Sequence, residues 1–205
     1  MLFGSGTLDF WQGWAFAAVN LVVTVIFSAC LYRYDRELLA RRLLRKENVG
    51  TQKAIMFIVR YIAVTAYVLC GLDHRFGWSR TYLMPVPAWL TVSALVAYAL
   101  SYMLFVPVLR ANRFASSIIQ VEAGQTVACH GPYRLVRHPF YTVSLVIWFW
   151  IPPALGSFVM LPVVLLLAPL IVWRLLNEEE ILKRNLPGYI EYCQRTRYRL
   201  IPHVW

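Results

Sequence analysis

The sequence predicts an all-α, polytopic membrane protein with about five transmembrane helices, because of its composition, its apolar runs and its charge distribution. Of the 205 residues, 60% are hydrophobic, and the mean hydropathy is +0.56. This combination is typical of polytopic membrane proteins rather than soluble domains. At roughly 20 residues per span, the chain accommodates about five helices with little left over. We therefore expect a single membrane domain over residues 1–205.

The distribution of Lys and Arg predicts the topology. Seven of these residues lie in 33–53, four in 110–137 and six in 174–199, whereas the loop after the second apolar run holds only Arg75 and Arg80. Segments rich in Lys and Arg stay in the cytoplasm, so we expect the N-terminus outside and the C-terminus inside. The net charge of +10 is thus a topology signal first and a source of attraction to anionic membrane lipids second. No nucleic-acid partner is expected, since nothing resembles a reading module.

The first half, residues 1–109, is expected to hold three spans and one interfacial helix. The apolar runs cover 11–32, 54–72 and 88–109. Between the first two runs, the segment 35–47 alternates charges with four leucines that share one face of a helical wheel. This pattern predicts an amphipathic helix that lies on the inner membrane surface, or alternatively a solvated helical connector.

The second half, residues 110–205, is expected to hold the functional site. It begins with a long irregular segment in which we expect a short extended piece around Ile118–Val121, and such structured loops usually line a site. The next apolar run, 140–151, would be about 18 Å long as a helix, which is too short for a full span. Either this helix continues through Pro152-Pro153 with a kink, or it starts below the membrane surface. A fifth span is expected over 158–176.

The first polar motif is Gly-Pro-Tyr-Arg-Leu-Val-Arg-His-Pro-Phe-Tyr at 131–141. Pro139 suits the first position of a helix, where its missing N–H is not needed. Arg137 and His138 would then lie at a helix N-terminus, which favours an anion. The guanidinium of Arg137 adds a fork that can hold a carboxylate. A simple membrane-interface anchor made of Arg, His and Tyr is the alternative.

The second polar motif lies at the end of the last apolar run. Arg174 and Glu178 are four residues apart and so face the same side of a helix. Three adjacent carboxylates at 178–180 repel each other unless a cation offsets them. That cation is Arg137, Arg134, a tail arginine or a ligand with an ammonium or sulfonium group, unless the run is merely solvated. Together, the two motifs suit a zwitterionic cofactor.

These motifs resemble a known family. Gly-Pro-Tyr-x-x-x-Arg-His-Pro-x-Tyr (131–141), Arg-x-x-x-Glu-Glu (174–179), Tyr-x-x-Tyr (189–192) and Arg-Leu-Ile-Pro (199–202) together look like the C-terminal half of the isoprenylcysteine carboxyl methyltransferases. The phospholipid N-methyltransferases share a related pattern. The resemblance covers roughly residues 112–202, and the combined pattern is specific, whereas Arg-His-Pro alone is weak.

The resemblance implies an integral, multi-pass membrane methyltransferase that uses S-adenosylmethionine at the cytoplasmic side. A lipophilic or prenylated acceptor, most simply a carboxylate, would enter laterally between spans. The residues implied to be catalytic are Arg174, near the acceptor, and Glu178. The residues implied to contact the cofactor are Tyr133, Val136, Arg137, His138, Pro139, Tyr141, Glu178 and Glu179. No metal site is expected, because the four cysteines lack metal-ligand spacing.

Two other functions remain open at this stage. Membrane reductases of the sterol reductase type have a similar C-terminal hairpin and a related Arg-His-Pro-Asn-Tyr motif, but they use NADPH. Here Phe140 stands in place of that asparagine, which argues against a reductase. A non-catalytic, lipid-binding membrane protein that keeps the hairpin as a scaffold is the second alternative.

Overall fold

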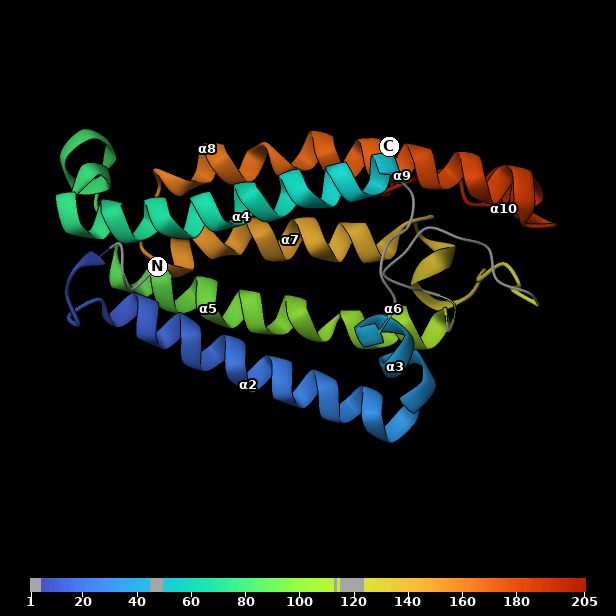
Figure 1. Cartoon of the computed structure of the whole chain (residues 1–205), viewed down its shortest axis with the longest axis horizontal. Coiled ribbons are helices and arrows are strands. Elements are labelled where there is room, and N and C mark those ends of the chain that lie inside the picture. Colours follow the sequence, from blue (N-terminus) through green and yellow to red (C-terminus); the bar gives the residue numbers. More distant parts are fainter. Residues whose placement is uncertain (1–4, 45–49, 113, 115–123) are drawn as a thin grey trace. The chain divides into compact units, whose positions relative to one another are not determined.

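The computed structural model describes residues 5–44, 50–112, 114 and 124–205, and every regular element among them is helical (Figure 1). This confirms the predicted all-α class. The expected extended piece around Ile118–Val121 and the end of the expected interfacial helix at 45–47 lie outside the described residues. The elements are α2 (Trp11–Tyr34), α3 (Arg36–Leu44), α4 (Gly50–Phe76), the π-helical turn η1 (Ser79–Leu83), α5 (Ala88–Met103), α6 (Phe105–Ala111), the 3-10 turn η2 (Gly131–Arg134), α7 (Pro139–Ala154), α8 (Met160–Leu165), α9 (Leu167–Asn185) and α10 (Tyr189–Arg195).

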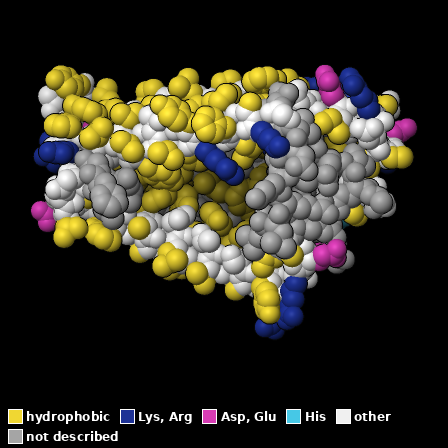
Figure 2. Space-filling model, viewed as in Figure 1, with side chains coloured by type: hydrophobic (Ala, Val, Ile, Leu, Met, Phe, Trp, Pro, Cys, Tyr) yellow, Lys and Arg dark blue, Asp and Glu magenta, His cyan; other side chains and the backbone are white. Residues whose placement is uncertain are grey.

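Four helical segments in the described part of the chain are long and apolar enough to cross a membrane. They are Trp11–Tyr34, Gln52–Phe76, Ala88–Ala111 and Met160–Asn185. They match the first, second, third and fifth predicted spans, so the protein is an integral membrane protein. Figure 2 shows hydrophobic side chains along the visible flank of the helices and acidic side chains toward the helix ends.

Helix α7 is too short to count as a fifth full span. Its 16 residues give a length of about 24 Å, against roughly 30 Å for the hydrocarbon core of a bilayer. Pro152 and Pro153 lie inside the helix, so it continues through the proline pair, as one of the two interpretations predicted, but it ends directly after them. The predicted count of five spans is therefore not confirmed, and the orientation of the termini stays a prediction.

The chain divides into two compact units, each built from three separate stretches. The first unit comprises Met1–Val25, Met56–Met103 and Leu145–Leu170, and the second comprises Ile26–Ile55, Leu104–Ser144 and Ile171–Trp205. All the residues predicted to form the site belong to the second unit.

The first unit has a buried polar centre around Asp73, near the end of α4. The carboxylate of Asp73 accepts hydrogen bonds from the hydroxyls of Ser79, at 2.5 Å, and Ser157, at 2.6 Å. It also accepts one from the backbone N–H of Ser79, while the Ser79 hydroxyl accepts one from the N–H of Phe158. One buried carboxylate thus ties together the end of α4, the turn η1 and the loop before α8, because a buried charge is tolerated only when it is hydrogen-bonded.

We expect Asp73→Ala to lower the thermal unfolding midpoint of the detergent-purified protein. The substitution leaves buried hydroxyl and N–H donors without their acceptor, which typically costs about 1–3 kcal/mol for each unsatisfied group. Asp9→Ala is the matched control, because Asp9 is exposed. Equal midpoints for the two variants would contradict a stabilising role for Asp73.

The second unit has an apolar core that includes the predicted amphipathic helix. Leu31 of α2, Leu38 of α3 and Leu109 of α6 are all buried together, and Figure 1 shows α3 close to α6. The Asp35 carboxylate accepts a hydrogen bond from the N–H of Leu38 at 2.9 Å and so stabilises the start of α3. The structure confirms the predicted helix, but Leu38 packs against other protein side chains, so the apolar face of α3 does not contact lipid alone. Its position relative to the membrane stays a prediction.

Candidate functional site

The site is built around the start of α7. Pro139 is the first residue of this helix, as predicted. The backbone N–H of Arg137 donates to the carbonyl of Tyr198 at 2.9 Å, and that of His138 donates to the carbonyl of Arg199 at 3.0 Å. The C-terminal segment thus occupies the two backbone N–H groups that directly precede the helix. The tail is therefore an integral part of the site.

The first buried cluster surrounds Glu179 of α9, whose side chain is only 2% exposed. Its Oε1 lies 2.8 Å from Nε of Arg137 and 3.3 Å from Nε2 of His138. Its Oε2 accepts a hydrogen bond from Nε of Arg199 at 3.1 Å and lies 3.7 Å from Nζ of Lys183. We call these five residues the Glu179 cluster. The cations predicted for the acidic run thus include Arg137 and a tail arginine, and one carboxylate joins both motifs to the tail.

The second buried cluster surrounds Arg174, which belongs to the same helix, α9. Nε of Arg174 donates to the hydroxyl of Tyr141 at 3.1 Å, and that hydroxyl donates to Oε2 of Glu178 at 2.6 Å. Nη1 of Arg174 donates to Oε1 of Gln52 at 2.9 Å. We call Arg174, Tyr141, Glu178 and Gln52 the Arg174 cluster. Arg174 and Glu178 do face the same side of the helix, as predicted, and the Tyr141 hydroxyl bonds to both.

Tyrosines of α10 support the segment between α6 and α7. Gly188, with φ 80°, makes the left-handed turn that allows α10 to begin directly after α9. The hydroxyl of Tyr192 then donates to the carbonyl of Tyr133 at 2.7 Å. Burial raises the pKa of Tyr192 and that of Tyr189 above their ordinary values. Both hydroxyls therefore keep their protons at neutral pH and are able to donate a hydrogen bond.

Among the described residues of the second unit, two buried side-chain donors lack a hydrogen-bond partner, Nε of Arg137 and the hydroxyl of Tyr189. The Arg137 contact with Glu179 is short, but it is an ion pair without hydrogen-bond alignment. Buried polar groups without partners are uncommon and call for an explanation such as a bound ligand.

The structure brings together six of the predicted site residues in the two clusters. These six are Arg137, His138, Tyr141, Arg174, Glu178 and Glu179. The other three, Tyr133, Val136 and Pro139, belong to the same unit but to neither cluster. Tyr133 and Val136 are buried, as are Arg137 and Arg174.

Gln52 is the member that sequence reasoning missed. It lies two residues before the predicted start of the second span and next to Lys53, where a polar residue reads as an ordinary interface position. Its partner Arg174 lies 122 residues away in the sequence. A contact over that distance leaves no periodic pattern, so only its unusual burial, at 1% exposure, marks it.

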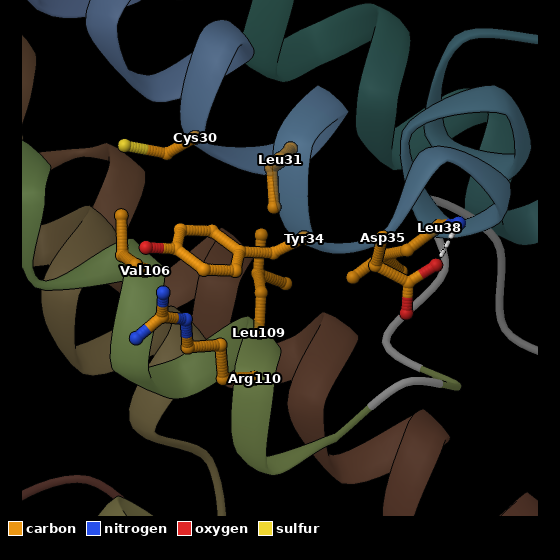
Figure 3. A pocket seen from close by; sticks show the side chains of 8 residues that line it. All are labelled: Cys30, Leu31, Tyr34, Asp35, Leu38, Val106, Leu109 and Arg110. Carbon is orange, nitrogen blue, oxygen red and sulfur yellow. Dashed lines mark hydrogen bonds between the residues drawn. The ribbon is translucent and has the colours of Figure 1, made fainter.

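A separate cavity of about 230 Å³ lies between α2, α3 and α6 of the second unit. Figure 3 shows the guanidinium of Arg110 facing the ring of Tyr34, and the two are 3.9 Å apart. Leu31, Leu38 and Leu109 form apolar walls of the cavity. None of the predicted site residues lines this cavity.

The fold and the clusters define an all-helical integral membrane protein that carries buried acidic and basic groups on one helix. Residues 91–184 match the model of the isoprenylcysteine carboxyl methyltransferase family. This match covers 94 of the 205 residues and confirms the resemblance inferred from the motifs. No curated protein matches the sequence significantly. The family match does not favour the reductase or the non-catalytic alternative.

Proposed function

We propose that the protein transfers the methyl group of S-adenosylmethionine to the carboxylate of a lipophilic, isoprenylcysteine-like acceptor at the cytoplasmic side of the membrane. The observation that carries the proposal is that two consecutive glutamates have different partners. Glu179 pairs with Arg137, His138 and the tail, whereas Glu178 is linked through Tyr141 to Arg174. One helix thereby supports two chemically distinct places, as a cofactor and an acceptor require.

The donor set suits the cofactor. The guanidinium of Arg137 and the hydroxyl of Tyr189, which has no hydrogen-bond partner among the described residues, would hold a carboxylate, and the partly exposed carboxylate of Glu178 would offset cationic charge. His138 is assigned a contact with the cofactor rather than the role of a base. When bound, S-adenosylmethionine supplies a methyl group on a sulfonium, which a nucleophile displaces in line.

Arg174 is assigned the acceptor. Its guanidinium is buried, so its attraction for a carboxylate is stronger than it would be in water. A carboxylate acceptor is already a nucleophile and needs no strong base. The chain's main contribution is then to orient the acceptor and to exclude water. The remaining predicted contacts, Tyr133, Val136, Pro139 and Tyr141, would form the walls of the cofactor site.

Calorimetry on the detergent-purified protein tests the proposal. We expect S-adenosylmethionine and S-adenosylhomocysteine to bind and NADPH not to bind. Tyr189→Phe should weaken both interactions, because it removes a neutral donor without changing the ring. Binding of NADPH alone would support a reductase, and binding of none of the three would support the non-catalytic alternative.

A further inference from the structure

Gln52 is a buried polar residue that neither motif contains and that lies outside the family match. It occupies the first turn of α4, and its side chain is almost completely inaccessible to solvent. Burying an amide costs free energy unless the amide is hydrogen-bonded. The amide oxygen of Gln52 accepts a hydrogen bond from Arg174, so the two residues have to be considered together.

The chemistry of the two groups fixes the orientation of the amide. A guanidinium has only donors, so the carbonyl oxygen of Gln52 must face Arg174. The partner that Gln52 gives to Arg174 is therefore the oxygen of a neutral amide.

Hydrogen bonds to two other helices fix the orientation of the guanidinium plane. Arg174 extends from α9, Tyr141 of α7 accepts from its Nε, and Gln52 of α4 accepts from its Nη1. Arginine recognises carboxylates through a planar fork, which works only when that plane is oriented correctly. Misplacement of such a group by as little as about 1 Å reduces a reaction rate by a large factor.

We infer that Gln52 is a positioning residue that orients Arg174 toward a carboxylate and makes the acceptor site select an anionic acceptor over a neutral one. The inference rests on the proposed function, because it assigns the acceptor to the Arg174 cluster. It adds a selectivity determinant from the N-terminal half of the chain.

Direct binding of two probes tests the inference on the detergent-purified, full-length protein. The probes are N-acetyl-S-farnesylcysteine, which has a free carboxylate, and its carboxamide, which differs only in charge. We expect the wild-type protein to bind the acid about tenfold more tightly, the size expected for one hydrogen bond to a charged group. Gln52→Met should reduce this preference severalfold, because the guanidinium loses one of its supports.

Gln52→Glu separates positioning from a merely structural role. The new carboxylate still accepts from Arg174, so the thermal unfolding midpoint should be kept, but its negative charge should abolish the preference for the acid. Gln12→Met is the matched control, since Gln12 is a glutamine of the first unit outside both clusters. It should leave the preference unchanged.

The outcomes distinguish this inference from the proposed function. Equal binding of acid and carboxamide by the wild-type protein, binding of neither probe, or an acid preference that survives in Gln52→Glu would each overturn the inference. The affinity for S-adenosylmethionine is measured on the same preparations. If the acid preference depends on Gln52 but S-adenosylmethionine does not bind, the proposed function fails and the carboxylate site stands.

Discussion

Arg174→Ala is expected to lower methyl-transfer turnover by about 100- to 1,000-fold, the usual effect of removing one preorganised group that stabilises reacting charge. The affinity for S-adenosylmethionine should change much less, because most of the residues assigned to the cofactor lie outside the Arg174 cluster. The measurement is a comparison of turnover at saturating acceptor with cofactor binding by calorimetry. Arg174→Lys should recover little activity, since lysine keeps the charge but lacks the planar fork.

The control for this prediction lies on the same helix. The side chain of Arg184 is 77% exposed, and its Nη2 lies 3.6 Å from Oε2 of Glu180, whose side chain is 69% exposed. Arg184→Ala removes the same charge from a solvated position, where ion pairs contribute little. Its turnover should match that of the wild-type protein. An unchanged turnover in Arg174→Ala would exclude Arg174 from the mechanism.

Glu179→Gln is expected to destabilise the second unit and to weaken cofactor binding at the same time. The glutamine leaves Arg137 as a buried cation without its counter-charge, and breaking a buried pair in this way costs about 3–5 kcal/mol. The amide keeps one neutral acceptor oxygen where the carboxylate has two charged ones, so the bond to Arg199 weakens as well and the tail should detach from the start of α7 more easily. The thermal unfolding midpoint and the rate of limited proteolysis of the tail report these two effects.

The neighbouring glutamate gives the control. Glu180 is 69% exposed and its partner Arg184 is also in solvent, so Glu180→Gln should leave the unfolding midpoint and the proteolysis rate unchanged. The two variants remove the same charge at adjacent positions, and only burial distinguishes them. Equal effects would mean that the ion pairs of Glu179 add nothing to folding.

Much of the fold could be predicted from the sequence, because a membrane helix is marked by a local run of about 20 apolar residues. Helix α2 begins at Trp11 and α5 begins at Ala88, as the apolar runs predicted. Helix α9 differs from the prediction, since it continues to Asn185 instead of ending near Leu176. Hydropathy marks only the part of a helix that fits in hydrocarbon, and α9 continues beyond it with charged residues.

The candidate site was predictable in its members but not in its pairings. Motif residues such as Arg137 and Glu179 stand out because charges beside apolar runs need partners. The sequence does not say which of three adjacent glutamates is buried, and that is decided by Arg137 and Arg199, which reach Glu179 from distant segments. Gln52 was missed for the same reason, since its importance depends on a residue of another helix.

The backbone bonds between the start of α7 and the tail bear on how the protein is made. The N–H groups of Arg137 and His138 pair with the carbonyls of Tyr198 and Arg199, which the ribosome adds much later. Chains are made from the N-terminus, so α7 is synthesised before these carbonyls exist. Synthesis of the motif at the start of α7 and completion of the site are thus separate events in biosynthesis. A chain arrested before Tyr198 would carry its helices in the bilayer and still lack a finished site.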